Sequence, residues 1–224
     1  MRCTPKVLIL GLALTASLLT TGCVPLLIGG TVGTAAFVST DRRTTGAQMA
    51  DEVMEKRINY EITQAIPQNL HLTVTSYNRR VLLTGEVGSQ ADKLKAQQIA
   101  QNSLEVSSVV NELMVGEVTS VGQRMSDSTL ATKVRTQLVG TSGVSLNQMK
   151  VVVDRGIVYL MGLVTQEEAN KAADVASRVS DVKSVIKVFE ILTPQEVQER
   201  MKLVSNPNQS TSGSENSDGT VTLQ

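Results

Sequence analysis

The sequence is poor in aromatic side chains and has no excess of either charge. Its 224 residues include three Tyr, two Phe and no Trp, and 21 basic residues balance 21 acidic ones. So few aromatics disfavour a platform for stacking nucleotide bases and an aromatic cage around a ligand. General nucleic-acid binding also needs an electropositive surface, which a net charge of zero does not favour. We therefore expect no nucleic-acid partner.

Cysteine and histidine are also rare, because the chain contains only Cys3, Cys23 and His71. Protein metal sites gather several Cys, His or carboxylate groups, and a catalytic base needs a nucleophile and an orienting group around it. His71 stands alone beside the start of a predicted strand. The carboxylate pair Glu167-Glu168 lies where a helix is expected to begin, a position that favours negative charge. We expect no enzyme, no metal site and no cofactor.

No hydrophobic run near the N-terminus is comfortably long enough for a membrane span. Residues 7–19 are apolar and follow Arg2 and Lys6, a pattern typical of a signal peptide. The run ends in LLTTGC, in which small residues precede Cys23. This resembles a bacterial lipobox, although the position three residues before the cysteine holds Thr20 rather than the usual Leu. The resemblance implies a signal peptide at residues 1–22 and a diacylglycerol on Cys23.

Lipidation would leave the mature chain, with its tether at residues 23–48, without a free thiol or a disulfide, which suits an oxidising periplasm. Val24, rather than Asp, after the cysteine resembles the sorting signal for the outer membrane. Stable anchoring takes more than one acyl chain, and a triacylated cysteine would satisfy that. The alternative is an uncleaved membrane anchor, because residues 24–38 are uncharged, but Pro25 and several glycines make this stretch a poor helix.

Two strand-like stretches share a glycine: VLLTGEV at residues 81–87 and VYLMGLV at residues 158–164. Three further blocks occur in the same order in both halves: RINYEI with KVRTQL, Ile99-Ala100 with Val175-Ala176, and EVSSVV with DVKSVI. These ordered matches predict a duplicated domain. We define copy one as residues 49–118 and copy two as residues 126–193, joined by a linker at 119–125.

The pattern within each copy predicts the element order α-β-β-α-β. In copy two, Leu130, Val134 and Leu138 have near-helical spacing, so they predict the inward stripe of the first helix. Two strands follow, and Asp154-Arg155-Gly156 supplies the turn chemistry of a hairpin, as Asn78 does in copy one.

A second helix is expected to begin at Thr165, since Thr165 and Glu168 form a capping-box pattern. The last strands are predicted at residues 109–115 and 185–192. Gly162 is interpreted as permitting a bulge or the close approach of a helix. Beyond copy two, residues 194–204 predict a short amphipathic helix, and the Ser-, Asn- and Gly-rich residues 205–224 predict a disordered tail.

The order α-β-β-α-β, the strand–Gly–Val step, the Ala-rich second helix and the V-x-S-V strand resemble the BON domain (bacterial osmotic-stress and nodulation module). The resemblance implies an α+β fold of two tandem BON domains, each with two helices packed on a three-stranded mixed sheet. Two copies behind a lipobox are similar to a family of outer-membrane lipoproteins. This second resemblance implies a lipid-anchored protein that faces the periplasm and supports outer-membrane integrity and the stress response, with enrichment at division sites.

In that family the second BON domain binds anionic phospholipid through its first helix. The matching positions run from Ser128 to Gln137, and the resemblance implies that Lys133 and Arg135 neutralise headgroups while Thr129 or Leu130 approaches the acyl boundary. The expected partner is therefore anionic phospholipid of the inner leaflet of the outer membrane.

Charge points to the same copy. Residues 49–117 carry nine acidic and six basic side chains, whereas residues 124–193 carry seven acidic and nine basic ones. Copy two is thus the better candidate to meet an anionic surface. Two alternatives stay open: an ordinary solvated helix face, and a non-enzymatic scaffold that binds an envelope-assembly protein.

Overall fold

The computed structural model describes residues 41–66 and 70–205. The predicted signal peptide, Cys23, the tether up to residue 40 and the predicted tail from residue 206 lie outside these described residues. Copy one contains, in order, α1 (Thr45–Ala65), β1 (His71–Tyr77), β2 (Arg80–Val87), α2 (Gln90–Asn102), β3 (Ser108–Asn111) and β4 (Met114–Val115). Copy two contains α3 (Val121–Val139), the short 3-10 helix η1 (Leu146–Gln148), β5 (Met149–Asp154), β6 (Ile157–Val164), α4 (Gln166–Ser177) and β7 (Ser184–Ile191), and α5 (Pro194–Ser205) follows. The first helix of each copy begins earlier than the predicted bounds, because α1 starts within the predicted tether and α3 starts within the predicted linker.

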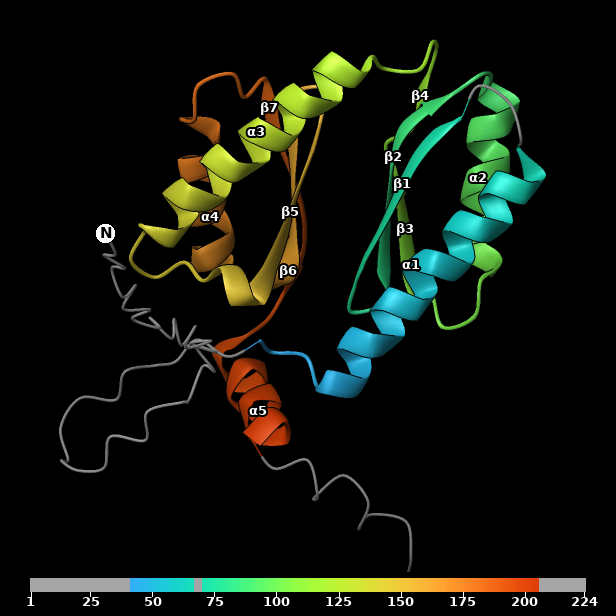
Figure 1. The fold of residues 1–224 in the computed structure, drawn as a ribbon. Helices are drawn as coiled ribbons and strands as arrows, with labels where there is room; N and C mark the ends of the chain where they lie inside the picture. The colour runs from blue at the N-terminus through green and yellow to red at the C-terminus, as the bar shows by residue number, and fades with distance from the viewer. Residues whose placement is uncertain (1–40, 67–69, 206–224) are drawn as a thin grey trace, which may run out of the picture. The chain divides into compact units, whose positions relative to one another are not determined.

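Each copy is a mixed sheet with two helices on one face (Figure 1). β2 pairs antiparallel with β1 and parallel with β3, and β6 pairs antiparallel with β5 and parallel with β7. The expected α+β fold, with two helices on a mixed sheet in each copy, is therefore confirmed. The sheet of copy two has the expected three strands, whereas β4 pairs parallel with β2 and gives the sheet of copy one a fourth strand. None of the described helices is long and apolar enough to cross a bilayer.

The hairpins and the start of α4 follow the local sequence. Asn78 and Arg79 have positive φ of 52° and 65°, and Arg155 and Gly156 have 51° and 77°. Two successive left-handed residues match the twist of the flanking strands, which is why such turns connect tight hairpins. At α4, the Thr165 hydroxyl accepts from the Glu168 N–H and the Glu168 carboxylate accepts from the Thr165 N–H. The predicted capping box is thus confirmed.

The last strand of copy one differs from the prediction. Residues 109–115 were expected to form one strand, but they form β3 and β4 with a break at Glu112 and Leu113. The Leu113 N–H donates to the side-chain oxygen of Asn111 at 3.2 Å, and Leu113 is fully buried in the core of copy one. A local side-chain bond thus replaces a ladder bond, as Asn commonly does. Copy two keeps one continuous β7.

Each copy has its own hydrophobic core between helices and sheet. In copy two the predicted helical stripe joins alternate residues of β6 and three alanines of α4: Leu130, Val134, Leu138, Val158, Leu160, Val164, Ala169, Ala172 and Ala176. The matching set in copy one is Met54, Ile58, Ile62, Val81, Leu83, Val87, Ala96 and Ala100. The alanines let the second helix lie close on the sheet.

The other face of the sheets is also apolar. Side chains from both copies form a third cluster on this face, made of Tyr77, Leu82, Tyr159, Met161, Leu163, Val188 and Leu192. Leu82 and Tyr159 are each at most 1 % exposed. The strands therefore bury consecutive residues on opposite faces, which explains why VLLTGEV and VYLMGLV are apolar almost throughout.

Gly162 lies against the junction of η1 and β5, and the equivalent Gly85 lies against the start of β1. In neither copy is the close neighbour an α-helix, and this corrects the interpretation of Gly162. A Cβ built at Gly162 would collide with the backbone carbonyl oxygen of Gln148 and lie 2.9 Å from the Met149 Cβ. A Cβ at Gly85, which has φ of 115°, would collide with the carbonyl oxygen of His71. In both copies the glycine lies in the second strand of the hairpin. Because it has no side chain, the chain at the start of the first strand can pass close to its backbone.

We predict that Gly162→Ala lowers the free energy of unfolding by about 2–3 kcal/mol, because backbone rather than a flexible side chain fills the space that the methyl group needs. Urea denaturation measures the loss. The matched control is Gly122→Ala in α3, where the nearest atom to an added Cβ is Ser120 Oγ at 3.9 Å and no stability should be lost. Equal stability of the two variants would contradict the strand-contact explanation.

Candidate functional site

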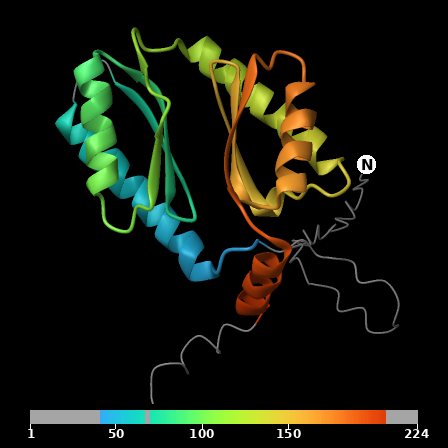
Figure 2. The ribbon, with the colours of Figure 1, turned by 180° about the vertical axis from the view of Figure 1, so that it is seen from behind.

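A groove separates the two helices of copy two. α3 and α4 lie side by side on the sheet (Figure 2), and a cavity of about 850 Å³ opens between them. Successive turns of α3 form one wall, while the end of α4 and the residues after it form the other. The lining residues are Thr129, Thr132, Lys133, Thr136, Gln137, Thr141, Val175, Arg178, Val179 and Ser180.

The charged side chains that line this groove are both cations. Lys133 pairs with Asp181 at 2.9 Å, with 47 % and 69 % of the two side chains exposed. Arg178 pairs with Asp174 at 2.8 Å, and both are again largely exposed. Exposed ion pairs of this kind contribute little free energy, so an incoming anion can displace the carboxylates. The groove thus has two cations near enough to the surface to meet a phosphate.

The threonines of the groove contribute polarity rather than free donors. The hydroxyls of Thr129, Thr132, Thr136 and Thr141 each donate to the carbonyl oxygen four residues earlier, at 2.8–3.1 Å. With these hydrogens used inside the helix, the attraction for an anion comes mainly from Lys133 and Arg178.

The equivalent groove of copy one is smaller and its charges are balanced. Its cavity measures about 440 Å³ and is lined by Arg57, Glu61, Ile99, Asn102, Ser103 and Leu104. Arg57, which corresponds to Lys133, donates to the Leu104 carbonyl at 2.6 Å and to the Ser103 hydroxyl at 3.1 Å. Glu61 supplies an acid, and Asn102 stands where copy two has Arg178. The two copies thus share the groove but not its charge.

The structure brings together only some of the residues predicted to bind lipid. Thr129 and Lys133 line the groove. Leu130 is 4 % exposed and packs in the core of copy two, as the helical stripe predicted, but together with Thr129 and Lys133 it also lines a neighbouring cavity of about 660 Å³. Arg135 is exposed, but it donates to the Val151 carbonyl of β5 at 2.7 Å and is not among the groove residues.

Sequence reasoning missed Arg178. Its charge was counted, but the sequence gives no register between α3 and α4, so nothing linked Arg178 with Lys133. The equivalence of Asn102 and Arg178 in the repeat could have singled it out, because it is a position where the copies differ in charge.

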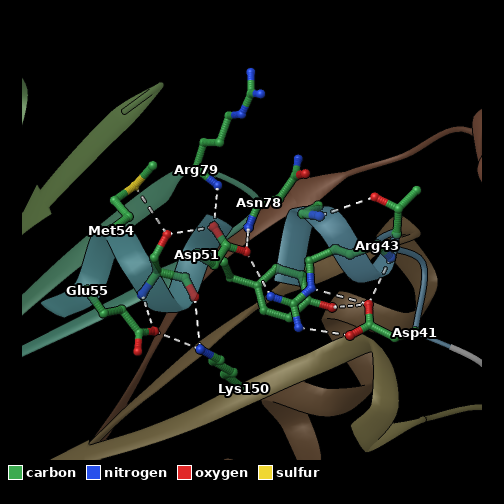
Figure 3. A network of polar contacts seen from close by, with 12 residues as sticks. Asp41, Arg43, Asp51, Met54, Glu55, Asn78, Arg79 and Lys150 are labelled. Atoms are coloured by element: carbon green, nitrogen blue, oxygen red, sulfur yellow. Dashed lines mark hydrogen bonds and ion pairs between the residues drawn. The ribbon is translucent and has the colours of Figure 1, made fainter. Parts of the chain in front are cut away.

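A buried carboxylate in α1 holds the hairpin of copy one (Figure 3). Asp51 is 1 % exposed and accepts from the N–H groups of Asn78 and Arg79 at 2.7 and 2.9 Å, the Ser76 hydroxyl at 2.7 Å and the Arg43 guanidinium at 2.8 Å. Arg43 also lies 3.7 Å from the centre of the Tyr77 ring. In copy two, Asp127 likewise accepts from the N–H groups of the hairpin, at 2.9 Å each. We assign both aspartates a structural role.

The surroundings of Asp51 keep it ionised. Burial alone would raise its pKa, but the hydrogen bonds from Arg79, Ser76, Asn78 and Arg43 outweigh burial and hold its pKa below the usual value. The carboxylate is therefore charged at neutral pH and matched by its donors.

His71 belongs to a second polar cluster. Its Nδ1 lies 3.1 Å from the Glu86 carboxylate, which is 2 % exposed and also accepts from the Thr119 N–H and hydroxyl. Arg155 lies 3.6 Å from Glu86 and 3.2 Å from Asp154. The contact of His71 with Glu86 gives it a structural partner. Among residues 41–66 and 70–205, no group of three His, Cys, Asp or Glu is placed to hold a metal ion.

Comparison with known proteins agrees with this architecture. The fold defines a tandem repeat of α-β-β-α-β domains in which the charge of one helical groove differs between the copies. The family model for the BON domain matches residues 51–117 and 126–193. The chain therefore belongs to the BON-domain family and carries two BON domains.

Individual relatives cover most of the chain. It is 40 % identical over 185 residues to outer membrane lipoprotein DolP of Haemophilus influenzae, covering 82 % of this chain and 95 % of that protein. It is 33 % identical over 151 residues to a 21 kDa hemolysin of Actinobacillus pleuropneumoniae, covering 66 % and 78 %. It is also 26 % identical over 170 residues to osmotically-inducible protein Y of Escherichia coli, covering 67 % and 85 %. None of these names denotes an enzymatic activity.

We predict that Asp51→Asn lowers the free energy of unfolding by about 3 kcal/mol at pH 7, because it breaks a buried, paired carboxylate. The folded-state pKa of Asp51 is lowered, so its stabilising contribution is present above the unfolded pKa of about 4 and is lost as the pH falls through the folded value. The difference between parent and variant should therefore shrink below pH about 4, as measured by urea denaturation across pH. Asp174→Asn, at an exposed pair, is the control and should change stability by less than about 0.5 kcal/mol at either pH.

Proposed function

We propose that this protein is a periplasm-facing outer-membrane lipoprotein whose second BON domain binds anionic phospholipid at the groove between α3 and α4. In this role it supports the integrity of the outer membrane, including at division sites. The 40 % identity to an outer membrane lipoprotein supports the location. The lipid proposal depends on one observation. The groove of copy two is lined by the cations Lys133 and Arg178, whereas the groove of copy one is smaller and its charges are balanced.

The energetics suit a membrane-tethered domain. Each cation close to an anionic surface contributes about 1 kcal/mol, which alone gives weak binding. A lipid on Cys23 would hold the domain beside the bilayer, and the resulting high effective concentration makes weak binding sufficient. The chain has no Trp, the best interfacial anchor, and Leu130 is packed inside. We therefore expect shallow, salt-sensitive binding to headgroups.

The direct test is a titration of the mature chain, made with Cys23→Ser, against vesicles with and without phosphatidylglycerol. We predict that Lys133→Gln with Arg178→Gln weakens binding to anionic vesicles about 30-fold, because about 2 kcal/mol of headgroup attraction is lost. Binding of the parent should also fall as salt rises. Arg135→Gln, outside the groove, should have a smaller effect.

The matched control removes the same charge from copy one with Lys56→Gln and Arg57→Gln, and it should weaken binding less than threefold. Equal losses in both pairs would mean that net charge, not the groove, attracts the membrane. Binding that ignores lipid charge would exclude the lipid proposal and favour the alternative, a non-enzymatic scaffold for an envelope-assembly protein.

Lipid anchoring is tested separately. We predict that Cys23→Ser in the full-length chain prevents processing and removes the protein from the outer-membrane fraction, because the thiol that carries the diacylglycerol is lost. Immunoblots of fractionated cells measure both effects, and Cys3→Ser is the control, since Cys3 lies within the predicted signal peptide. Unchanged processing and fractionation of Cys23→Ser would support an uncleaved anchor instead.

A further inference from the structure

A second groove lies where α5 passes the start of α4. It has a volume of about 790 Å³. Its apolar wall includes Val144, which precedes η1, and Val197 and Met201 of α5, while Arg42, Gln148 and Glu168 supply polar groups. Val197 also packs against the cluster shared by the two sheets, so α5 is held in place on this side.

The chain that leads into copy one is fastened at this groove. Arg42 is 6 % exposed, and its guanidinium binds the Glu168 carboxylate through two hydrogen bonds of 2.7 and 2.8 Å. It also donates to the Leu163 carbonyl at 2.8 Å. Arg42 therefore fixes the start of the described chain to copy two, although the next element along the sequence, α1, belongs to copy one.

We propose that the segment just before Asp41, centred on Phe37 and Val38, docks in this groove. The sequence from Val24 to Thr40 has no charged side chain, and Ala35-Ala36-Phe37-Val38 is apolar. Phe37 is five residues before Arg42, and an extended chain advances at most about 3.6 Å per residue, so Phe37 reaches no more than about 18 Å from Arg42. Because Arg42 already lines the groove, the segment needs little extra ordering to enter it.

Two buried polar atoms at the groove favour a peptide as the occupant. Neither Gln148 Oε1 nor Arg42 Nε has a hydrogen-bond partner among the described residues. One is an acceptor and the other a donor, and burial without a partner costs free energy. A peptide backbone offers both an N–H and a carbonyl oxygen, whereas an acyl chain offers neither. Met201 adds a flexible side chain that can adapt to an aromatic ring.

Docking would decide which domain lies nearest the membrane anchor. The tether precedes copy one in the sequence, but with its last residues docked it would extend towards the membrane from the surface of copy two. This holds copy two close to the lipidated cysteine. The proposal does not depend on lipid binding at the α3–α4 groove, since it concerns a different surface.

Disulfide trapping tests the contact in the full mature chain with Cys23→Ser, which contains no other thiol. Val38→Cys is combined with Met201→Cys, so that Phe37 stays intact, and the intramolecular disulfide is quantified by mass spectrometry after mild oxidation. The matched control combines Val38→Cys with Leu203→Cys on the same helix, because Leu203 is 50 % exposed. We expect the pair with Met201→Cys to form at least tenfold faster than the control pair. Equal rates would overturn the proposal.

A second measurement uses no engineered thiol. Phe37→Asp should increase amide hydrogen exchange of α5 and of residues 143–148, while α1 and α2 exchange as in the parent. Unchanged exchange at the groove would overturn the proposal. Protection that requires added phospholipid would identify an acyl chain as the occupant, and protection that rises with protein concentration would identify a second copy. Either outcome would also overturn it.

Discussion

The structure depends on covering the second face of each sheet. Two helices cover one face in each BON domain, and a domain of about 70 residues without a disulfide or metal has little core to spare. The other face presents Leu82 in copy one and Tyr159, Met161 and Leu163 in copy two, and these side chains share one buried cluster. The duplication therefore provides each apolar sheet face with an apolar partner. With the sheets used for stability, the helical surfaces are left for binding.

The two copies show how one scaffold acquires two surfaces. Asp51 and Asp127 hold their hairpins in the same way, so these positions build the fold in both domains. Arg57 and Lys133 occupy equivalent positions, yet Arg57 donates to the Leu104 carbonyl of copy one, whereas Lys133 forms an exposed ion pair with Asp181. The difference lies in what surrounds each cation, and an exposed cation can meet an anion at little cost.

Two adjacent arginines give the segment before α1 an unusual connection. Arg43 binds Asp51 and Asp41 beside the hairpin of copy one, while Arg42 binds Glu168 and the Leu163 carbonyl in copy two. The Glu168 carboxylate has two roles, since it also completes the cap of α4. Hydrogen bonds from Arg42 and Thr165 outweigh the effect of burial and hold its pKa below the usual value. The point where the tether enters the protein is thus held by two arginines that each bind a carboxylate.

The sequence by itself determined what local chemistry controls: the duplication, the order α-β-β-α-β, the hairpin turns and the cap of α4. Helical spacing also placed Leu130 in the core, and the conflicting expectation that it contacts lipid came from the resemblance alone. Only the tertiary structure placed Arg178 opposite Lys133, put the junction of η1 and β5 rather than an α-helix beside Gly162, and broke the last strand at Leu113. These features depend on the register between elements distant in sequence. Periodicity and turn chemistry constrain each element along its own axis, whereas side-chain packing fixes how one element lies against the next.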